Sequence, residues 1–287
     1  MRYVITHAMF SREELGAGSG RLFMAPRDVP GQHVHSHRLD INPVPNDRTD
    51  HIDLYGNRFT YFAVDHPHRL SITAISEIDL HNCRPLTDPA ERWESARAEV
   101  GSDPLVVDFV LPSGRVELTA EIAAFAAVSF VSSRPLLDCL NDLAQRIAAL
   151  RQPGSTTTDL AHFAVACFRS MGLASRFVTG YVESPNSSMA VPLVGAGSLH
   201  AWAAVRDASG IWIDVDPSNA LVEPVSHLAL GWGRDGGDID PLRRAEARCG
   251  AGAVTIESTV EVRRASRRDG RQRGSLKAGR ERLKGLC

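Results

Sequence analysis

The sequence predicts an α+β protein in which a strand-rich first part precedes a helical segment and a second set of strands. Short apolar or alternating runs, separated by turn signals, fill residues 1–115. Leu and Ala then recur every three or four residues between 118 and 150, which is the period of a helix, and short apolar strands return after residue 175. The 287 residues are enough for two domains, and we expect their boundary near Pro112-Ser113-Gly114.

Composition and charge narrow the class of function. Hydrophobic residues make up 43% of the chain and charged residues 23%, as in globular proteins. The formal net charge of −2 gives the whole chain no strong attraction to nucleic acid or membranes. From Arg263 onward the chain is dense in Arg and Lys and has no core pattern. We interpret it as a solvated tail, with binding to nucleic acid or an anionic surface as the alternative.

The cysteines and the first residues indicate a cytoplasmic protein. The five cysteines are scattered and form no CxxC pair, which argues against a disulfide framework or a zinc cluster. They are Cys83, Cys139, Cys167, Cys249 and Cys287. The start of the chain has no apolar signal-peptide region, and no apolar run approaches the roughly 20 residues of a membrane span. We therefore expect no contact with a membrane.

Turn signals divide the first part into the strands of a small sandwich. Gly16–Gly20 and Pro43–Asn46 are two of these turns. The predicted strands are Tyr3–Thr6, Val34–Ile41, His51–Leu54, Arg58–Val64, Leu70–Ile78 and Leu105–Val110. His33, His35 and His37 alternate, so on a strand their imidazoles share one face. Such a stripe binds a metal in some proteins and is the solvated face of an edge strand in others.

Three helices follow the boundary. The first is predicted over Ala120–Phe130 and the second, amphipathic one over Pro135–Leu150. The third runs from about Thr157 to Met171 and is apolar nearly all round, so we expect it to be buried. Thr156 and Asp159 have the spacing of a capping box at its start.

The strands after residue 175 include a hairpin. Arg176–Val182 is the first strand, and His200–Val205 and Ile211–Val215 are joined by the polar loop Arg206–Gly210. After the hairpin, Gly231–Pro241 is predicted to be a tight acidic loop and Val254–Val262 a last strand.

An antiparallel hairpin places the start of its first strand beside the end of its second, so His200 and Asp216 should lie close together. A carboxylate beside an imidazole fixes its tautomer and stabilises its charged form, which general-base chemistry needs. The alternative is that both residues are structural, with Asp216 starting a turn before Pro217.

With these residues in view, the chain resembles the bacterial transglutaminase-like family, which has a papain-like core behind a small β domain. The core matches are Thr158–His162, Gly172–Tyr181, Leu199–Trp202, Trp212–Asn219, and Gly233-Arg234-Asp235 with Asp238 and Pro241. The β-domain matches are Arg21–Arg27, His37–Asp40 and Leu54–Asn57. The resemblance implies a β domain over residues 1–115, a transglutaminase-like core over 116–262 with a buried helix packed on an antiparallel sheet, and a basic tail over 263–287.

The resemblance also implies a catalytic triad whose nucleophile has changed. In the family, a cysteine two residues before the helix-start Asp attacks a peptide or glutamine amide, His takes its proton, and Asp orients the His. His200 and Asp216 match the last two roles, and the cysteine position is occupied by Thr157. Trp202, in the matched piece around His200, is a candidate substrate contact. No cofactor and no metal centre are predicted.

Threonine changes the chemistry of that position. A thiol beside an imidazole at a helix N-terminus ionises readily, whereas an alcohol needs full general-base help. Helix capping is the other explanation for Thr157. Cys167 lies about 15 Å further along the helix, in its apolar interior, so it is expected to be a core thiol.

Three functions therefore remain open. The favoured one is a transglutaminase-like module with impaired amide chemistry that binds a peptide or protein. The second is a working hydrolase or acyltransferase that uses Thr157 or water with His200 as base. The third is binding of nucleic acid or a surface through residues 263–287.

Overall fold

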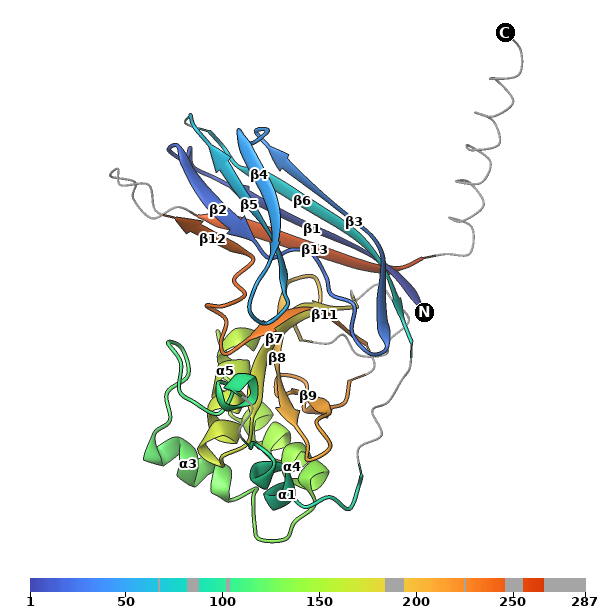
Figure 1. The fold of residues 1–287 in the computed structure, drawn as a ribbon, viewed down its shortest axis with the longest axis vertical. Coiled ribbons are helices and arrows are strands. Elements are labelled where there is room, and N and C mark those ends of the chain that lie inside the picture. Colours follow the sequence, from blue (N-terminus) through green and yellow to red (C-terminus); the bar gives the residue numbers. More distant parts are fainter. Residues whose placement is uncertain are drawn as a thin grey trace, which may run out of the picture.

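The structure is a computed structural model that describes residues 1–66, 68–81, 88–101, 104–183, 194–224, 226–245 and 255–265. A two-sheet β part lies against a five-stranded sheet that is packed with helices (Figure 1). The predicted α+β fold is confirmed. No helix in these residues is long and apolar enough to cross a membrane.

Two four-stranded antiparallel sheets form the β part. Their orders are β13-β1-β6-β3 and β12-β2-β5-β4. The strands are β1 Arg2–Ser11, β2 Gly18–Leu22, β3 Gln32–Asn42, β4 Asp47–Ile52, β5 Arg58–Val64, β6 Ser71–Leu80, β12 Leu242–Ala245 and β13 Ile256–Arg264. A buried cluster that includes Met9, Leu39 and Ile72 of one sheet and Leu22 and Phe62 of the other holds the two sheets together.

The last strand returns to the β part. We expected it within the core of residues 116–262, with the basic tail beginning at Arg263. Instead β13 pairs antiparallel with β1 along its whole length, and it includes Arg263 and Arg264. Its alternation gave no sign of its partner, because pairing between distant segments leaves no local pattern. The remainder of the tail, residues 266–287, lies outside the described residues.

Three predictions in the first part were wrong in whole or in part. The apolar run Leu105–Val110 contains the short helix α2, Pro104–Val107, because such a run suits either structure and proline is favoured at a first helical position. The expected turn at Gly16–Gly20 largely belongs to β2. Gly20 lies so close to Phe62 that a Cβ would be 2.8 Å from its ring, which explains a glycine in a strand. The strand expected at His51–Leu54 begins earlier, as β4, and is fully exposed.

The core sheet has five antiparallel strands in the order β10-β9-β8-β7-β11. They are β7 Ser175–Val182, β8 His200–Arg206, β9 Trp212–Asp216, β10 Leu221–Val222 and β11 His227–Gly233. Its helices are α1 Trp93–Ala98, α3 Ala120–Ala127, α4 Leu136–Ala149 and α5 Thr157–Ser170. β11 covers the start of the segment predicted to be a tight loop.

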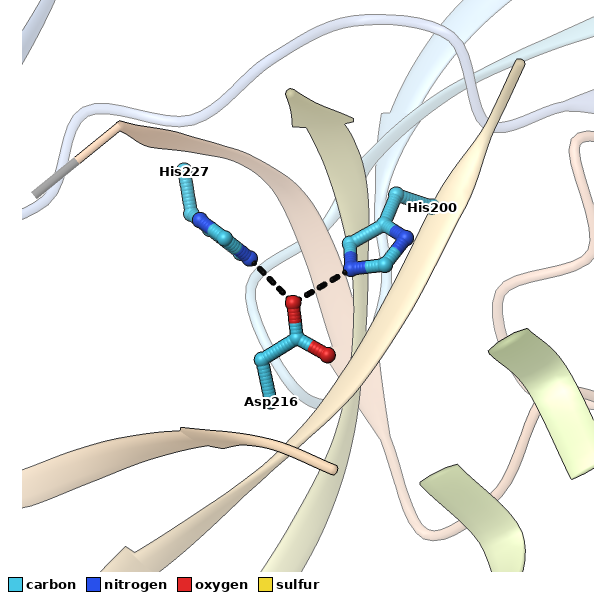
Figure 2. A group of neighbouring side chains, drawn as sticks. All are labelled: His200, Asp216 and His227. Atoms are coloured by element: carbon cyan, nitrogen blue, oxygen red, sulfur yellow. Dashed lines mark hydrogen bonds and ion pairs between the residues drawn. The ribbon is translucent and has the colours of Figure 1, made fainter. Parts of the chain in front are cut away.

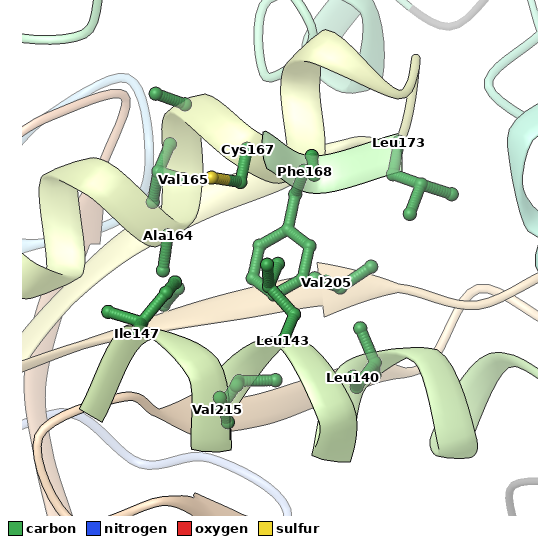
Figure 3. Packing of buried hydrophobic residues seen from close by; sticks show 14 of the residues in the cluster. Leu140, Leu143, Ile147, Ala164, Val165, Cys167, Phe168, Leu173, Val205 and Val215 are labelled. Atoms are coloured by element: carbon green, nitrogen blue, oxygen red, sulfur yellow. The ribbon is translucent and has the colours of Figure 1, made fainter. Parts of the chain in front are cut away.

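Helices α4 and α5 pack on one face of this sheet (Figure 3). Leu140, Leu143 and Ile147 of α4 meet Phe168 of α5 and Val205 of β8, and all five side chains are fully buried. Burial of each such large apolar side chain contributes about 1.5–3 kcal/mol, so this cluster fixes α5 against β8. The predicted burial of the third helix is confirmed.

Strands β7 and β11 of the core sheet contact the β part. Tyr181, Leu228 and Leu230 pack with Tyr3 and Ile5 of β1 in one buried cluster. At the free edge of the sheet, Gln32 exchanges two hydrogen bonds with the backbone of Ala229, and Asn57 does the same with Trp232. The side-chain amides of Gln32 and Asn57 therefore pair with backbone N–H and carbonyl groups on the edge of β11, as a neighbouring strand would.

Candidate functional site

The predicted hairpin is formed by β8 and β9, with Ala203 opposite Val215 and Arg206 opposite Trp212. Its loop is closed by Asp207, whose carboxylate accepts hydrogen bonds from the Ser209 hydroxyl and the Ile211 backbone N–H. Gly210 completes the turn with a φ of 93°, a conformation that favours glycine. This geometry brings His200, which begins β8, to Asp216, which ends β9.

His200 and Asp216 are hydrogen-bonded, with 2.8 Å between His200 Nε2 and Asp216 Oδ2. Neither side chain has any exposed surface. Figure 2 shows the imidazole edge turned toward the carboxylate. The local sequence thus brings together two of the three predicted site residues.

His227 is a third member of this cluster and was not predicted from the sequence. It begins β11, and its Nε2 lies 2.8 Å from the same Asp216 oxygen (Figure 2). Gly180 of β7 separates the two histidine strands, since it pairs with His200 on one side and Ala229 on the other. A Cβ at Gly180 would lie 2.6 Å from the Trp202 ring and 2.2 Å from the Leu228 carbonyl oxygen, so the close packing here requires glycine.

A sequence signal for His227 did exist. Leu228 and Leu230 alternate with small residues from His227 to Gly231, which is a strand pattern. The glycines that follow favoured a loop instead, and a strand interpretation still names no partner for His227.

Both carboxylate oxygens of Asp216 accept several hydrogen bonds. Its Oδ1 accepts from the backbone N–H groups of Ser218, at 2.9 Å, and Asn219, at 3.3 Å. Its Oδ2 also accepts from the Asn219 side-chain amide at 2.7 Å. Burial alone would raise the pKa of Asp216, but hydrogen bonds from His200 and His227 outweigh it and hold that pKa far below its usual value. The carboxylate is therefore ionised and only accepts hydrogen bonds.

Thr157 is the first residue of α5 and is half-buried. The expected capping box precedes it: the Thr156 hydroxyl accepts from the Asp159 N–H, and the Asp159 carboxylate accepts from the Thr156 N–H. Thr156, not Thr157, is the cap. Within the described residues no hydrogen bond joins Thr157 to His200, so the third predicted site residue is not bonded to the other two.

The Nδ1 side of His200 is covered by backbone. A Cβ built on Gly195 would lie 2.3 Å from His200 Nδ1, and this nitrogen has no hydrogen-bond partner among the described residues. Asn219 holds the covering turn, because its side chain accepts from the Val194 N–H at 2.8 Å and donates to the Val194 carbonyl at 3.3 Å. Asn219 thus contacts both Asp216 and the turn that lies against His200.

Trp202 has no exposed surface in this conformation. Its ring lies 6.0 Å from that of His200 and 5.0 Å from that of His227, between ring centroids. The indole therefore packs against both imidazoles, and a role in contacting substrate stays a prediction.

The segment after β11 is anchored to α5. The Gly236 N–H donates to His162 Nε2 at 2.9 Å, and the buried Arg169 guanidinium donates to the Arg234 carbonyl at 2.6 Å. Burial lowers the pKa of His162, which keeps the imidazole neutral and able to accept. These contacts fix the end of β11, and with it the strand that carries His227.

The described cysteines are core thiols. Cys139 and Cys167 are fully buried, and burial raises the pKa of each to about 12. Thiols in such surroundings are inert at neutral pH. Cys83, Cys249 and Cys287 lie outside the described residues.

Two groups invite a test for metal binding. His33, His35 and His37 have separate partners, which are Asp28, Asp79 and Ser76. A bulge between Val34 and Ser36 also breaks the alternation that would place them on one face. The His33 and His35 rings meet edge to face with centroids 4.8 Å apart, but the three histidines do not form a group of metal-ligand atoms among the described residues.

His200, Asp216 and His227 are the second group, with ligand atoms within 4.8 Å of one another. Both Nε2 atoms already face the carboxylate as donors. Neither Nδ1 atom has a hydrogen-bond partner among the residues that the structure describes, whereas metal-bound histidines nearly always donate their other nitrogen to an acceptor. The donor set thus favours a hydrogen-bonded cluster over a metal centre.

Comparison with known families places these residues in context. Residues 12–79 match the model of the bacterial transglutaminase-like N-terminal region. Residues 132–217 match the model of the transglutaminase-like superfamily, and this range includes Thr157, His200 and Asp216.

Relatives and a solved structure agree with these matches. The uncharacterized protein Rv2569c of Mycobacterium tuberculosis is 34% identical over 271 residues, covering 84% of this chain and 86% of its own. ML0607 of Mycobacterium leprae, also uncharacterized, is 24% identical over 257 residues, covering 84% and 90%. The structure named as a putative cysteine protease from Cytophaga hutchinsonii shares the fold, with a TM-score of 0.72, 16% identity and coverage of 93% and 91%. The chain belongs to the transglutaminase-like superfamily and carries its bacterial N-terminal region.

Proposed function

We propose that this protein is a transglutaminase-like module whose amide chemistry is impaired and whose role is to bind a peptide or protein. One observation carries the proposal. The alcohol Thr157 occupies the position that matches the cysteine of the family, and its side chain is not hydrogen-bonded to His200. The scattered cysteines support a cytoplasmic location for this module.

The chemical reason is the difference between a thiol and an alcohol. Thiolate–imidazolium catalysis depends on a nucleophile that ionises near neutral pH, and threonine does not. The threonine nucleophiles that do work use a free N-terminal amine as base, which position 157 does not have. Neither Cys139 nor Cys167 can substitute, since both are buried with a pKa raised to about 12.

The competing function is a hydrolase or acyltransferase in which His200 activates water or Thr157. Its support is the intact hydrogen bond between His200 and Asp216. Against it, His200 is fully buried and Gly195 covers its free nitrogen. A substrate would have to displace that turn before proton transfer.

The decisive experiment compares the wild-type protein with Thr157→Cys and Thr158→Cys. Thr158 is a matched control, because it is the next residue of the same helix and is also half-buried. We expect no amine incorporation or amide hydrolysis by the wild type over a broad peptide panel. Strong wild-type turnover that is lost in His200→Ala would overturn the proposal and support the competing function.

The new thiols provide a second readout. We expect Cys at position 157 to react with iodoacetamide below neutral pH faster than Cys at position 158, with rates resolved by peptide mass spectrometry. The combined variant Thr157→Cys/His200→Ala should lose this advantage. Equal rates at both positions would mean that Thr157 does not face the imidazole, and the assigned nucleophile position would be wrong.

A further inference from the structure

Asp216 accepts hydrogen bonds from two imidazoles at one oxygen. A triad of nucleophile, base and orienting acid needs only one of these imidazoles. His200 Nε2 and His227 Nε2 both lie 2.8 Å from Asp216 Oδ2. The two rings meet edge to face with centroids 5.3 Å apart, and neither is exposed. A second buried histidine at this position needs a physical explanation.

We propose that His227 is a positioning residue that divides the Asp216 carboxylate between two imidazoles and so holds His200 as a neutral ring with its lone pair on Nδ1. This inference rests on the proposed function for the identity of the site and deepens it.

The hydrogen bonds at Asp216 determine which ring nitrogen of His200 and His227 carries hydrogen. Because the ionised carboxylate has no proton to give, both histidines must carry hydrogen on Nε2. The free Nδ1 atoms of both rings have no partner among the described residues. A buried lone pair without a partner is less costly than a buried N–H or a buried charge without one, which favours neutral rings.

The charges around the two rings support the sharing of Asp216 between His200 and His227. The groups that face the two rings are Asp216 from β9 and each other, with Asp214 further off acting on His227. Burial lowers the pKa of His227, although Asp216 opposes this effect. One carboxylate balances one added proton, so two charged rings would leave a buried net positive charge.

The donors around Asp216 weaken its support for an imidazolium. It accepts five hydrogen bonds, two at Oδ1 and three at Oδ2. Each donor lowers the basicity of the carboxylate, and His227 is the one that lies next to His200. Its removal should therefore shift the proton of the cluster toward His200.

The test uses His227→Phe and His227→Gln in the full-length chain. Phe keeps the approximate volume of the ring and removes the donor, whereas Gln keeps an N–H donor near the Nε2 position. Ring nitrogen NMR of His200 as a function of pH is the first readout, with circular dichroism to check the fold. We expect His200 to become protonated at higher pH in His227→Phe, while His227→Gln behaves like the wild type.

The second readout is the iodoacetamide rate of Thr157→Cys. We expect Thr157→Cys/His227→Phe to react about tenfold faster below neutral pH, which corresponds to one pKa unit, and Thr157→Cys/His227→Gln to be unchanged. The NMR readout needs no thiol, so it still tests His227 if the proposed role of position 157 fails.

Three outcomes would overturn the inference. The His200 signals could be identical in wild type and both variants, with only the melting temperature lowered, which would make His227 structural. The pH at which His200 is protonated could shift equally in His227→Phe and His227→Gln, which would show that the N–H donor at position 227 has no role. Stoichiometric Zn²⁺ added to the wild type could move both Nε2 signals, which would assign the cluster as a metal site.

Discussion

Gly195 lies directly against His200, so that a single added methyl group would come within 2.3 Å of His200 Nδ1. The free nitrogen of the imidazole therefore lies against main chain. Because Gly195 also has a φ of 87°, its backbone favours glycine for a second reason. In this conformation the turn around Gly195 blocks the atom that would accept a proton.

Gly195→Ala should destabilise the protein more than Gly197→Ala. Both glycines have left-handed φ values, 87° and 84°, so alanine is strained by about 1 kcal/mol or more at each. Only at position 195 does the methyl also meet the imidazole, since a Cβ at Gly197 has nothing within 4 Å. Urea denaturation measures both free energies of unfolding. Equal losses would show that the contact with His200 is absent in solution.

Asn219→Ala should expose His200. The Asn219 amide is the link between Asp216 and the Val194 backbone, so its loss frees the covering turn. We expect faster modification of His200 by diethyl pyrocarbonate, followed by mass spectrometry. Ser218→Ala is the control, because the buried Ser218 hydroxyl has no hydrogen-bond partner in the described part of the chain. An unchanged rate in Asn219→Ala would mean that the turn is held by other contacts.

The free energy of unfolding should fall as pH drops from 6.5 toward about 4, in part through His7. His7 is buried between Tyr181 and Ser258, and burial lowers its pKa from 6.5 to about 4. Between these values the unfolded chain binds more protons than the folded one, so acid favours unfolding. The contribution of His7 is about 3 kcal/mol.

His7→Gln should flatten that pH dependence. The exposed His33→Gln variant should leave it unchanged, because His33 is largely in solvent. Urea denaturation across this pH range measures the slope. A slope equal to that of the wild type in His7→Gln would place the acid sensitivity on other histidines such as His162 and His227, whose pKa values burial also lowers.

Local patterns predicted the hairpin, the capped helix and the hydrogen bond between His200 and Asp216. In each case the partners are separated by a short loop or a single turn, so their geometry follows from nearby residues. The role of His227 and the pairing of β13 were missed because neither follows from a local sequence pattern. The pairing of β13 with β1 spans nearly the whole sequence. The bond from His227 to Asp216 depends on how β7, β8 and β11 are ordered in the sheet.

The edge of β11 offers the final prediction, because this strand carries His227 and is held from outside by Asn57. The Asn57 amide donates to the Trp232 carbonyl at 2.7 Å, and the Trp232 N–H donates back at 3.0 Å. Asn57 is 2% exposed, so water cannot replace these bonds without opening the interface. Asn57→Ala should therefore leave two buried backbone groups unpaired and cost about 2–3 kcal/mol.

Asn46→Ala is the matched control for this variant. Asn46 makes a similar two-way pairing, with Asp65, but it is exposed, so water satisfies the freed groups and the cost should stay below about 0.5 kcal/mol. Because Asn57 holds the end of β11, its loss should also broaden the ring signals of His227 in NMR spectra. If Asn57→Ala is as stable as Asn46→Ala, the contact between the β part and β11 is not what fixes that strand.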